Sequence, residues 1–218
     1  FKKNLWIGTA SGLSKFDGKN FVNYTTKNGL QYNEIYVLCT TKNGALWIGG
    51  KGGVTLWDGS SFRKYNFDEG NSSGVVTSIF EDSKGNTWFG SYQGGLVKYD
   101  GRTFKDMRKD LGLKGEAFMA INEDREGNLY FGTFEGVYMF DGKKLNNFNE
   151  HDGLSSELVY NLTFENEKRE QLWIGTNQGI NKLEVGEFKR TGKKIIEPYG
   201  KEEGFAGVEC NTNATFRD

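Results

Sequence analysis

Residues suited to ligand binding outnumber residues suited to catalysis in this sequence. The one histidine is His151, and the two cysteines are Cys39 and Cys210. A multi-histidine metal site is therefore excluded, and a Ser-His-Asp triad would depend on a single imidazole in a polar loop. Two cysteines are too few for a disulfide framework, so we expect both to be small buried residues. We assign no catalytic residue, no metal ligand and no cofactor.

The candidate binding residues combine aromatic rings, amides and charged groups near the ends of predicted strands. They are Tyr32, Glu34, Lys51, Tyr92, Gln93, Glu116, Phe134, Glu135, Asn177, Gln178 and Glu209. Aromatic faces stack on the C–H patches of sugars, while amides and carboxylates pair with hydroxyl groups. An oligosaccharide or another small ligand is the expected partner, although any polar loop at a channel mouth would contain similar residues.

Three of the acidic candidates suggest a second use. Glu34, Glu116 and Glu209 recur near the starts of predicted inner strands. A ring of such carboxylates could hold a cation; equally, each could cap a turn or face the solvent. The acidic ring is therefore a hypothesis and not an assignment.

A repeat that runs through the whole chain must position these residues. Its clearest copy is Leu46-Trp47-Ile48-Gly49-Gly50, and its central aromatic residues are Trp6, Trp47, Trp88, Tyr130 and Trp173, spaced by 41, 41, 42 and 43 residues. A period in the forties with aromatic and glycine markers is typical of a β-propeller blade. Because the tryptophans occupy one fixed place in the blade, we expect them to pack in the core and not to bind sugars.

Each repeat divides into four predicted strands, which we name inner, second, third and outer. The predicted inner strands cover residues 35–41, 75–82, 118–124 and 158–165. Asp-Gly pairs at 17–18, 58–59, 100–101 and 141–142 predict tight hairpins between third and outer strands, because such turns need positive φ. The fifth copy lacks this pair, so we expect a looser turn at Gly186 and an irregular extended edge over 189–197.

The two ends of the chain predict how the propeller closes. No inner strand precedes Leu5, whereas residues 208–218 read as an inner strand with no second strand after it. That strand can complete the blade begun by residues 5–25, which would remove an exposed sheet edge. We therefore predict one all-β domain over 1–218, a closed five-bladed propeller of five repeats of about 42 residues. The alternative is five blades of a longer propeller.

Composition excludes several classes of partner. The chain has 28 basic and 29 acidic residues and a net charge of −1. No basic field is available for a phosphate backbone, so nucleic-acid binding is not expected. No apolar run approaches the ~20 residues that span a bilayer, and no signal peptide is visible, so this segment is not expected to contact the membrane directly.

The repeat resembles the two-component regulator propeller repeat. The likeness rests on Asn4-Leu5-Trp6-Ile7-Gly8-Thr9, on residues 81–90 and on the Gly-Leu-x-x-Tyr/Phe-Asp-Gly phrases. Residues 204–205 and 211–214 resemble the closing repeat of such a region. The resemblance implies the periplasmic sensor region of a Bacteroidetes hybrid two-component protein, which senses dietary glycans and carries a histidine kinase elsewhere. Full sensors of this type have more repeats, so a fragment of a larger protein is expected.

Two classes of function remain open. The first is a non-catalytic sensor domain that binds an oligosaccharide, or a partner such as a second copy of itself, and signals to attached domains. The alternative is a propeller glycosidase or lyase, which for a glycosidase needs channel carboxylates paired at about 5–5.5 or 6.5–9.5 Å. Carboxylates occur only at the inner-strand ends, as at Glu81, Asp82, Glu123 and Asp124. That distribution disfavours catalysis.

Overall fold

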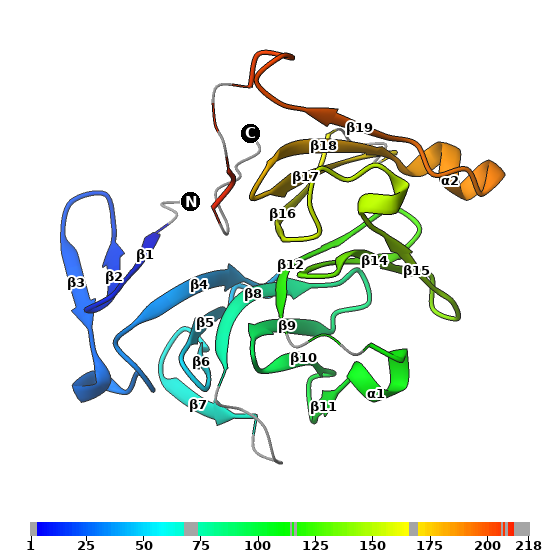
Figure 1. Cartoon of the computed structure of the whole chain (residues 1–218). Helices are drawn as coiled ribbons and strands as arrows, with labels where there is room; N and C mark the ends of the chain where they lie inside the picture. The colour runs from blue at the N-terminus through cyan, green and yellow to red at the C-terminus, as the bar shows by residue number, and fades with distance from the viewer. Residues whose placement is uncertain are drawn as a thin grey trace. The chain divides into compact units, whose positions relative to one another are not determined.

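The computed structural model describes residues 4–67, 74–113, 115, 117–165, 170–205, 207 and 209–211. These residues form five antiparallel sheets, each built from consecutive strands of the chain (Figure 1). Four sheets have four strands, and the first has three described strands. The predicted all-β class with four-stranded blades is confirmed. No described helix is long and apolar enough to cross a membrane.

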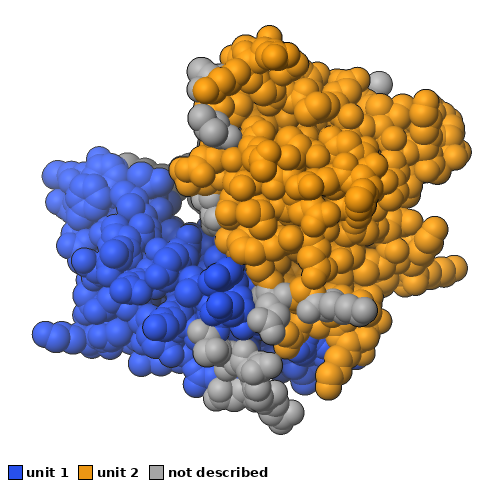
Figure 2. Space-filling view, viewed as in Figure 1, with its two compact units in different colours: residues 1–81, 85–107 blue, residues 82–84, 108–218 orange. Residues whose placement is uncertain are grey.

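The chain divides into two compact units, coloured separately in Figure 2. Unit 1 comprises residues 1–81 and 85–107, and unit 2 comprises residues 82–84 and 108–218. Unit 1 holds the first three sheets and unit 2 the last two. Each unit has its own hydrophobic core, and each is described on its own below.

Unit 1 is built almost entirely from strands. Its first sheet contains β1 (Leu5–Thr9), β2 (Gly12–Phe16) and β3 (Phe21–Tyr24), followed by a 3-10 turn at Thr26–Asn28. Its second sheet contains β4 (Ile35–Thr40), β5 (Leu46–Gly50), β6 (Gly53–Trp57) and β7 (Phe62–Asn66). Its third sheet contains β8 (Val75–Glu81), β9 (Thr87–Tyr92), β10 (Gly95–Tyr99) and β11 (Phe104–Asp106). These boundaries follow the predicted inner, second, third and outer strands closely.

Unit 2 adds two short helices to the same strand pattern. After α1 (Arg108–Leu111), its first sheet contains β12 (Phe118–Glu123), β13 (Leu129–Thr133), β14 (Gly136–Phe140) and β15 (Leu145–Phe148). A 3-10 turn at Glu150–Asp152 leads to the last sheet. That sheet contains β16 (Val159–Phe164), β17 (Gln171–Thr176), β18 (Gly179–Glu184) and β19 (Ile196–Tyr199), with α2 (Val185–Thr191) inserted before β19.

The prediction for residues 186–197 was wrong. Gly186 does not form a loose turn but lies inside α2, and the outer strand begins only at Ile196. The helix forms because Val185 is 1% exposed and Phe188 packs edge-on against Phe148, with ring centroids 4.9 Å apart. Gly192 ends the helix with φ 77°, and its N–H donates to Phe188 O, which is a standard glycine C-terminus.

The repeated tryptophans pack in the core where the sheets are stacked. Trp47 is 2% exposed, and its ring centroid lies 5.0 Å from that of Phe89 in the next sheet of unit 1. The glycine that follows lets the sheets approach: a Cβ on Gly49 would stand 2.5 Å from Val37 Cγ1 and 2.9 Å from Val76 Cγ1. The core role predicted for these tryptophans is therefore confirmed for Trp47 and for Trp88, which is 3% exposed.

The four Asp-Gly hairpins share one hydrogen-bond pattern. The carboxylates of Asp17, Asp58, Asp100 and Asp141 each accept the backbone N–H groups of the residues two and three positions further on. The glycine after each aspartate has φ between 94° and 101°. These backbone hydrogen bonds lower the pKa of all four aspartates.

The last described residues follow the geometry of an inner strand. Cys210 N–H donates to Thr176 O at 2.9 Å, and a Cβ on Gly175 would stand 3.0 Å from Cys210. Val159 of β16 approaches Gly132 of the preceding sheet in the same way, at 2.8 Å. The rest of the predicted closing strand, residues 208 and 212–218, lies outside the described residues. Ring closure and the single-domain organisation stay predictions.

Candidate functional site

Every four-stranded sheet has a β-bulge at the same place in its inner strand. The pairing register shifts between Ile35 and Val37, Val76 and Ser78, Phe118 and Ala120, and Val159 and Asn161. The extra residues are Tyr36, Thr77, Met119 and Tyr160. A bulge redirects a side chain and interrupts pairing, and bulges are common beside functional sites. These bulges were not predicted from the sequence.

In unit 1 the bulge brings a tyrosine to a group of exposed polar and aromatic residues. We define the tyrosine patch as Tyr32, Tyr36 and Tyr92, which are 40%, 49% and 40% exposed, together with Glu34 and Lys51. The Tyr36 hydroxyl donates to Glu34 Oε2 at 3.2 Å. Partial burial, and then this hydrogen bond, raise the pKa of Tyr36. The structure thus adds Tyr36 to four residues that the sequence had singled out.

Backbone pairing explains why residues from two sheets meet in the tyrosine patch. A Cβ on Gly50 would stand 3.5 Å from Tyr32 Cβ and 2.9 Å from Glu34 O, so this loop lies directly over the end of β5. The next residue, Lys51, forms a β-bridge with Val75, and Val75 pairs with Tyr92. The patch therefore spans the second and third sheets of unit 1.

The loop that carries Tyr32 and Glu34 is held firmly. Thr25 and Asn28 form a reciprocal capping box, and the next glycine has φ 113°. Leu30 is completely buried, and Gln31 N–H donates to Thr55 Oγ1 of β6 at 3.1 Å. A loop fixed at these points presents its exposed side chains with little loss of conformational entropy on binding.

Unit 2 repeats this loop construction. Asn149 and Asp152 form the same capping box, and Leu154 is 4% exposed. Ser155 N–H donates to Asn181 Oδ1 at 2.9 Å, as Gln31 N–H does to Thr55. His151 lies in this 3-10 turn with its side chain exposed, in agreement with its interpretation as a loop residue.

The predicted site residues of unit 2 are positioned differently from one another. Phe134 is half-buried against Tyr160, with ring centroids 5.9 Å apart. Glu135 accepts a 2.7 Å hydrogen bond from Tyr138, and burial followed by this bond raises the pKa of Tyr138 to about 12. Asn177 Oδ1 is buried with no partner among the described residues, whereas Gln178 is exposed.

The predicted site residues are divided between the two units. Tyr32, Glu34, Lys51, Tyr92 and Gln93 belong to unit 1, whereas Phe134, Glu135, Asn177, Gln178 and Glu209 belong to unit 2. Glu116 lies outside the described residues, so the acidic ring stays a hypothesis. Within the described ranges, no three or more His, Cys, Asp or Glu side chains are grouped to hold a metal ion.

The carboxylates at the inner-strand ends are engaged in structural contacts. Glu81 Oε2 accepts the Lys42 backbone N–H at 2.6 Å, and Glu123 accepts the backbone N–H and the hydroxyl of Ser83, each at 2.8 Å. Asp124 accepts hydrogen bonds from its own turn. Such contacts leave these groups poorly placed to act as an acid and base pair.

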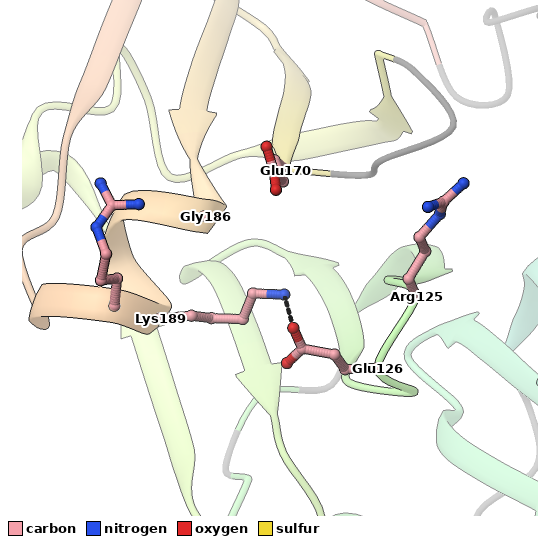
Figure 3. Close-up of a pocket in the computed structure, with 6 residues that line it drawn as sticks. Arg125, Glu126, Glu170, Gly186 and Lys189 are labelled. Atoms are coloured by element: carbon pink, nitrogen blue, oxygen red, sulfur yellow. Dashed lines mark hydrogen bonds and ion pairs between the residues drawn. The ribbon is translucent and has the colours of Figure 1, made fainter.

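A pocket of about 650 Å³ in unit 2 was missed by the sequence analysis. It is lined by Arg125, Glu126, Glu170, Gly186, Lys189 and Arg190 (Figure 3). Lys189 reaches from α2 to Glu126 on the turn between β12 and β13, at 2.9 Å. Three of the six lining residues, Gly186, Lys189 and Arg190, belong to α2, a helix that was not predicted from the sequence. No local sequence motif indicates the pocket.

Comparison with known proteins identifies the repeat. Residues 29–52 and 70–93 match the two-component regulator propeller family. The chain contains two-component regulator propeller repeats. The two matched repeats lie in unit 1 and include all five residues of the tyrosine patch. The resemblance inferred from the sequence is therefore confirmed.

Solved structures with the same fold include extracellular domains. The extracellular domain of the hybrid two-component system BT3049 from B. thetaiotaomicron has a TM-score of 0.76 and 22% identity, over 94% of this chain and 28% of that one. The extracellular domain of BT4673 from the same organism gives 0.68 and 24%, over 82% and 26%. This chain therefore spans about a quarter of the length of these proteins.

A third similar structure is an enzyme. Virginiamycin B lyase from Staphylococcus aureus has a TM-score of 0.65 and 16% identity, over 91% of this chain and 67% of that one. No curated protein matches the chain. Because the identities are below 25%, these solved structures show that this chain has the propeller fold and show nothing of its activity.

Proposed function

We propose that this chain is a non-catalytic, extracytoplasmic ligand-binding propeller of a two-component signalling protein. It recognises a carbohydrate through the tyrosine patch and passes the binding event to attached domains. The observation that carries this proposal is that the two matched regulator repeats contain the whole patch. The extracellular domains that share the fold support a place outside the cytoplasm, and the resemblance favours the periplasm.

The chemistry of the tyrosine patch suits a sugar chain. Three tyrosine rings offer faces for stacking, and tyrosine contributes contact area at low entropic cost because it has only two χ angles. Glu34 can accept hydrogen bonds from sugar hydroxyls, and Lys51 can donate to them. The loop that carries Tyr32 and Glu34 is fixed by the hydrogen bonds described above, so this part of the patch is ordered before a ligand binds.

A catalytic function has less support. A propeller glycosidase or lyase would need carboxylates free to act on a substrate, whereas Glu81 and Glu123 bind backbone N–H groups. The lyase similarity concerns the fold alone. A homodimer or another protein partner is the remaining alternative for how the propeller signals.

The proposal is tested by thermal unfolding of the chain with a panel of neutral and acidic oligosaccharides. A ligand at a hundredfold excess over Kd stabilises the folded state by about 2.7 kcal/mol. We expect one class of glycan to raise the melting temperature without being cleaved, and Tyr32→Ala with Tyr92→Ala to abolish the shift. Phe21→Ala is the matched control, because Phe21 is a 59% exposed aromatic residue outside the patch.

Two outcomes would contradict the proposal. Cleavage of the glycan would establish an enzyme. No shift with any glycan, together with a concentration-dependent increase in sedimentation coefficient, would favour signalling through a dimer.

A further inference from the structure

The pocket of unit 2 exists because the fifth sheet departs from the repeat. The other four sheets join their third and outer strands by an Asp-Gly hairpin, whereas the fifth inserts α2. Lys189 and Arg190 of the helix line the pocket together with Arg125 and Glu126 of the turn between β12 and β13. The pocket belongs to unit 2 and shares no residue with the tyrosine patch of unit 1.

A buried carboxylate, Asp124, joins the two elements that line the pocket, the turn between β12 and β13 and α2. The side chain of Asp124 is 0% exposed. Its Oδ1 accepts the N–H groups of Glu126 and Asn128 at 2.9 and 3.0 Å, and its Oδ2 accepts bonds from Asn128 Nδ2, the Tyr130 hydroxyl and Lys189 Nζ at 2.8, 3.1 and 3.2 Å. Burial and the charge of Asp124 raise the pKa of Tyr130, which keeps its hydroxyl a donor. The turn and the lysine are therefore held in place.

The walls of the pocket carry both signs of charge. Three cations, Arg125, Lys189 and Arg190, face two carboxylates, Glu126 and Glu170. Lys189 uses two of its three N–H donors on Asp124 and Glu126. Burial alone would lower the pKa of Lys189, but its contacts with Glu126 and Asp124 raise it, so the ammonium stays charged.

The outer groups of the pocket are accessible. The Arg190 side chain is 70% exposed and contacts Glu187 of its own helix. Such an exposed ion pair contributes little and is readily exchanged for a ligand. Glu170 is exposed, and its carboxylate lies on the side of the pocket opposite Glu126 (Figure 3).

Size and charge together select a class of ligand. A volume of about 650 Å³ is ordinary for a small-molecule site. An apolar ligand would remove the exposed charged groups of Glu126, Glu170 and Arg190 from water, which is costly. A polyanion would be repelled by the two glutamates, and a pure cation by the lysine and arginines. A small zwitterion satisfies both sets.

We propose that this pocket binds a free amino acid or short peptide. The ligand's carboxylate pairs with the Arg190 guanidinium, whose donors match carboxylate geometry, and with the remaining Lys189 donor. The ligand's ammonium group pairs with Glu170. The site would give the propeller a second input, distinct in chemistry from a sugar.

The experiment is isothermal titration of the full chain with Ala-Ala, which has no charged side chains. N-acetyl-Ala-Ala lacks the ammonium group, and Ala-Ala amide lacks the carboxylate. We expect Ala-Ala to bind and each blocked form to bind about tenfold more weakly, the loss of one charge-assisted contact. Glu170→Gln should weaken the binding of Ala-Ala about tenfold and leave the affinity for N-acetyl-Ala-Ala unchanged. Arg190→Gln should also weaken the binding of Ala-Ala about tenfold, but should leave the affinity for Ala-Ala amide unchanged.

The control variant is Lys143→Gln, which removes an exposed cation of unit 2 away from the pocket. It should leave the affinity for Ala-Ala unchanged, and thermal unfolding should show all three variants to be folded. Equal affinity for the blocked and unblocked peptides would overturn the proposal. Binding of glucuronate but not Ala-Ala would overturn it too, as would the absence of heat with Ala-Ala at millimolar concentration.

Discussion

Glu81, at the end of β8, accepts the backbone N–H of Lys42, in the turn between β4 and β5, at 2.6 Å. This contact joins two neighbouring sheets of unit 1 through groups 39 residues apart. It also gives the carboxylate at the end of this inner strand a structural role. Glu81 therefore links the second and third sheets of unit 1.

Removing this carboxylate should lower stability. We expect Glu81→Ala to reduce the free energy of unfolding by about 1 kcal/mol, because the Lys42 N–H loses its charged acceptor. Glu81→Gln, which keeps an acceptor oxygen, should lose less. Urea unfolding measures both, with Glu202→Ala as the exposed control. Equal stability of all variants would mean that the contact does not hold the sheets together.

The Asp-Gly hairpins should make stability depend on acid. Backbone hydrogen bonds from Ser61 and Ser60 lower the pKa of Asp58 in the folded state. A lowered folded-state pKa gives stability that is present above the unfolded pKa, near 4, and is lost as pH falls through the folded value. The melting temperature should therefore decrease as the pH is lowered below about 4. The melting temperature of Asp58→Asn should decrease less steeply over this range. Parallel curves for the two proteins would contradict this.

Alanine substitutions at two glycines distinguish the loss of stability caused by steric crowding from the loss caused by backbone strain. Gly49→Ala places a Cβ 2.5 Å from Val37 and 2.9 Å from Val76, so we expect a loss of about 2 kcal/mol from overpacking. Gly59→Ala meets nothing within 4 Å but must keep φ 101°, so we expect about 1 kcal/mol. In a Val76→Ala background, the additional loss from Gly49→Ala should be smaller than in the unmodified chain, whereas the loss from Gly59→Ala should be unchanged. Denaturant unfolding of the single and double variants checks this.

Ring closure is tested by deleting residues 208–218. The deletion removes the Cys210 bond to Thr176, so exchange at the end of β17 should accelerate. If this segment also completes the first blade, the amides of β1 should lose protection in the same variant. Hydrogen exchange followed by mass spectrometry reports both regions. Unchanged exchange in β1 would exclude closure by this strand.

Local signals account for the parts of the fold that the sequence predicted correctly. The Trp-Ile-Gly strand and the Asp-Gly hairpin depend on neighbours a few residues away, so their positions could be read directly. Helix α2 was missed because Gly186 suggested a turn, whereas burial of Val185 and the contact between Phe188 and Phe148 decide the conformation. Those contacts depend on packing that no short motif records.

The candidate sites show the same limit. The loop residues Tyr32, Glu34 and Tyr92 were identified by type and place in the repeat. Tyr36 was not, because a bulge changes which way an inner-strand side chain points. The pocket was also missed, since its ion pair joins Lys189 to Glu126, 63 residues earlier.

The bulges of the inner strands bear on how such propellers could diversify. At each bulge one residue is left out of the ladder, so its side chain can change without shifting the pairing of the strand around it. The four sheets already place a tyrosine, a threonine, a methionine and a second tyrosine at this position. A lineage could therefore change the residue at this position sheet by sheet, by point mutation alone, while every strand keeps its register.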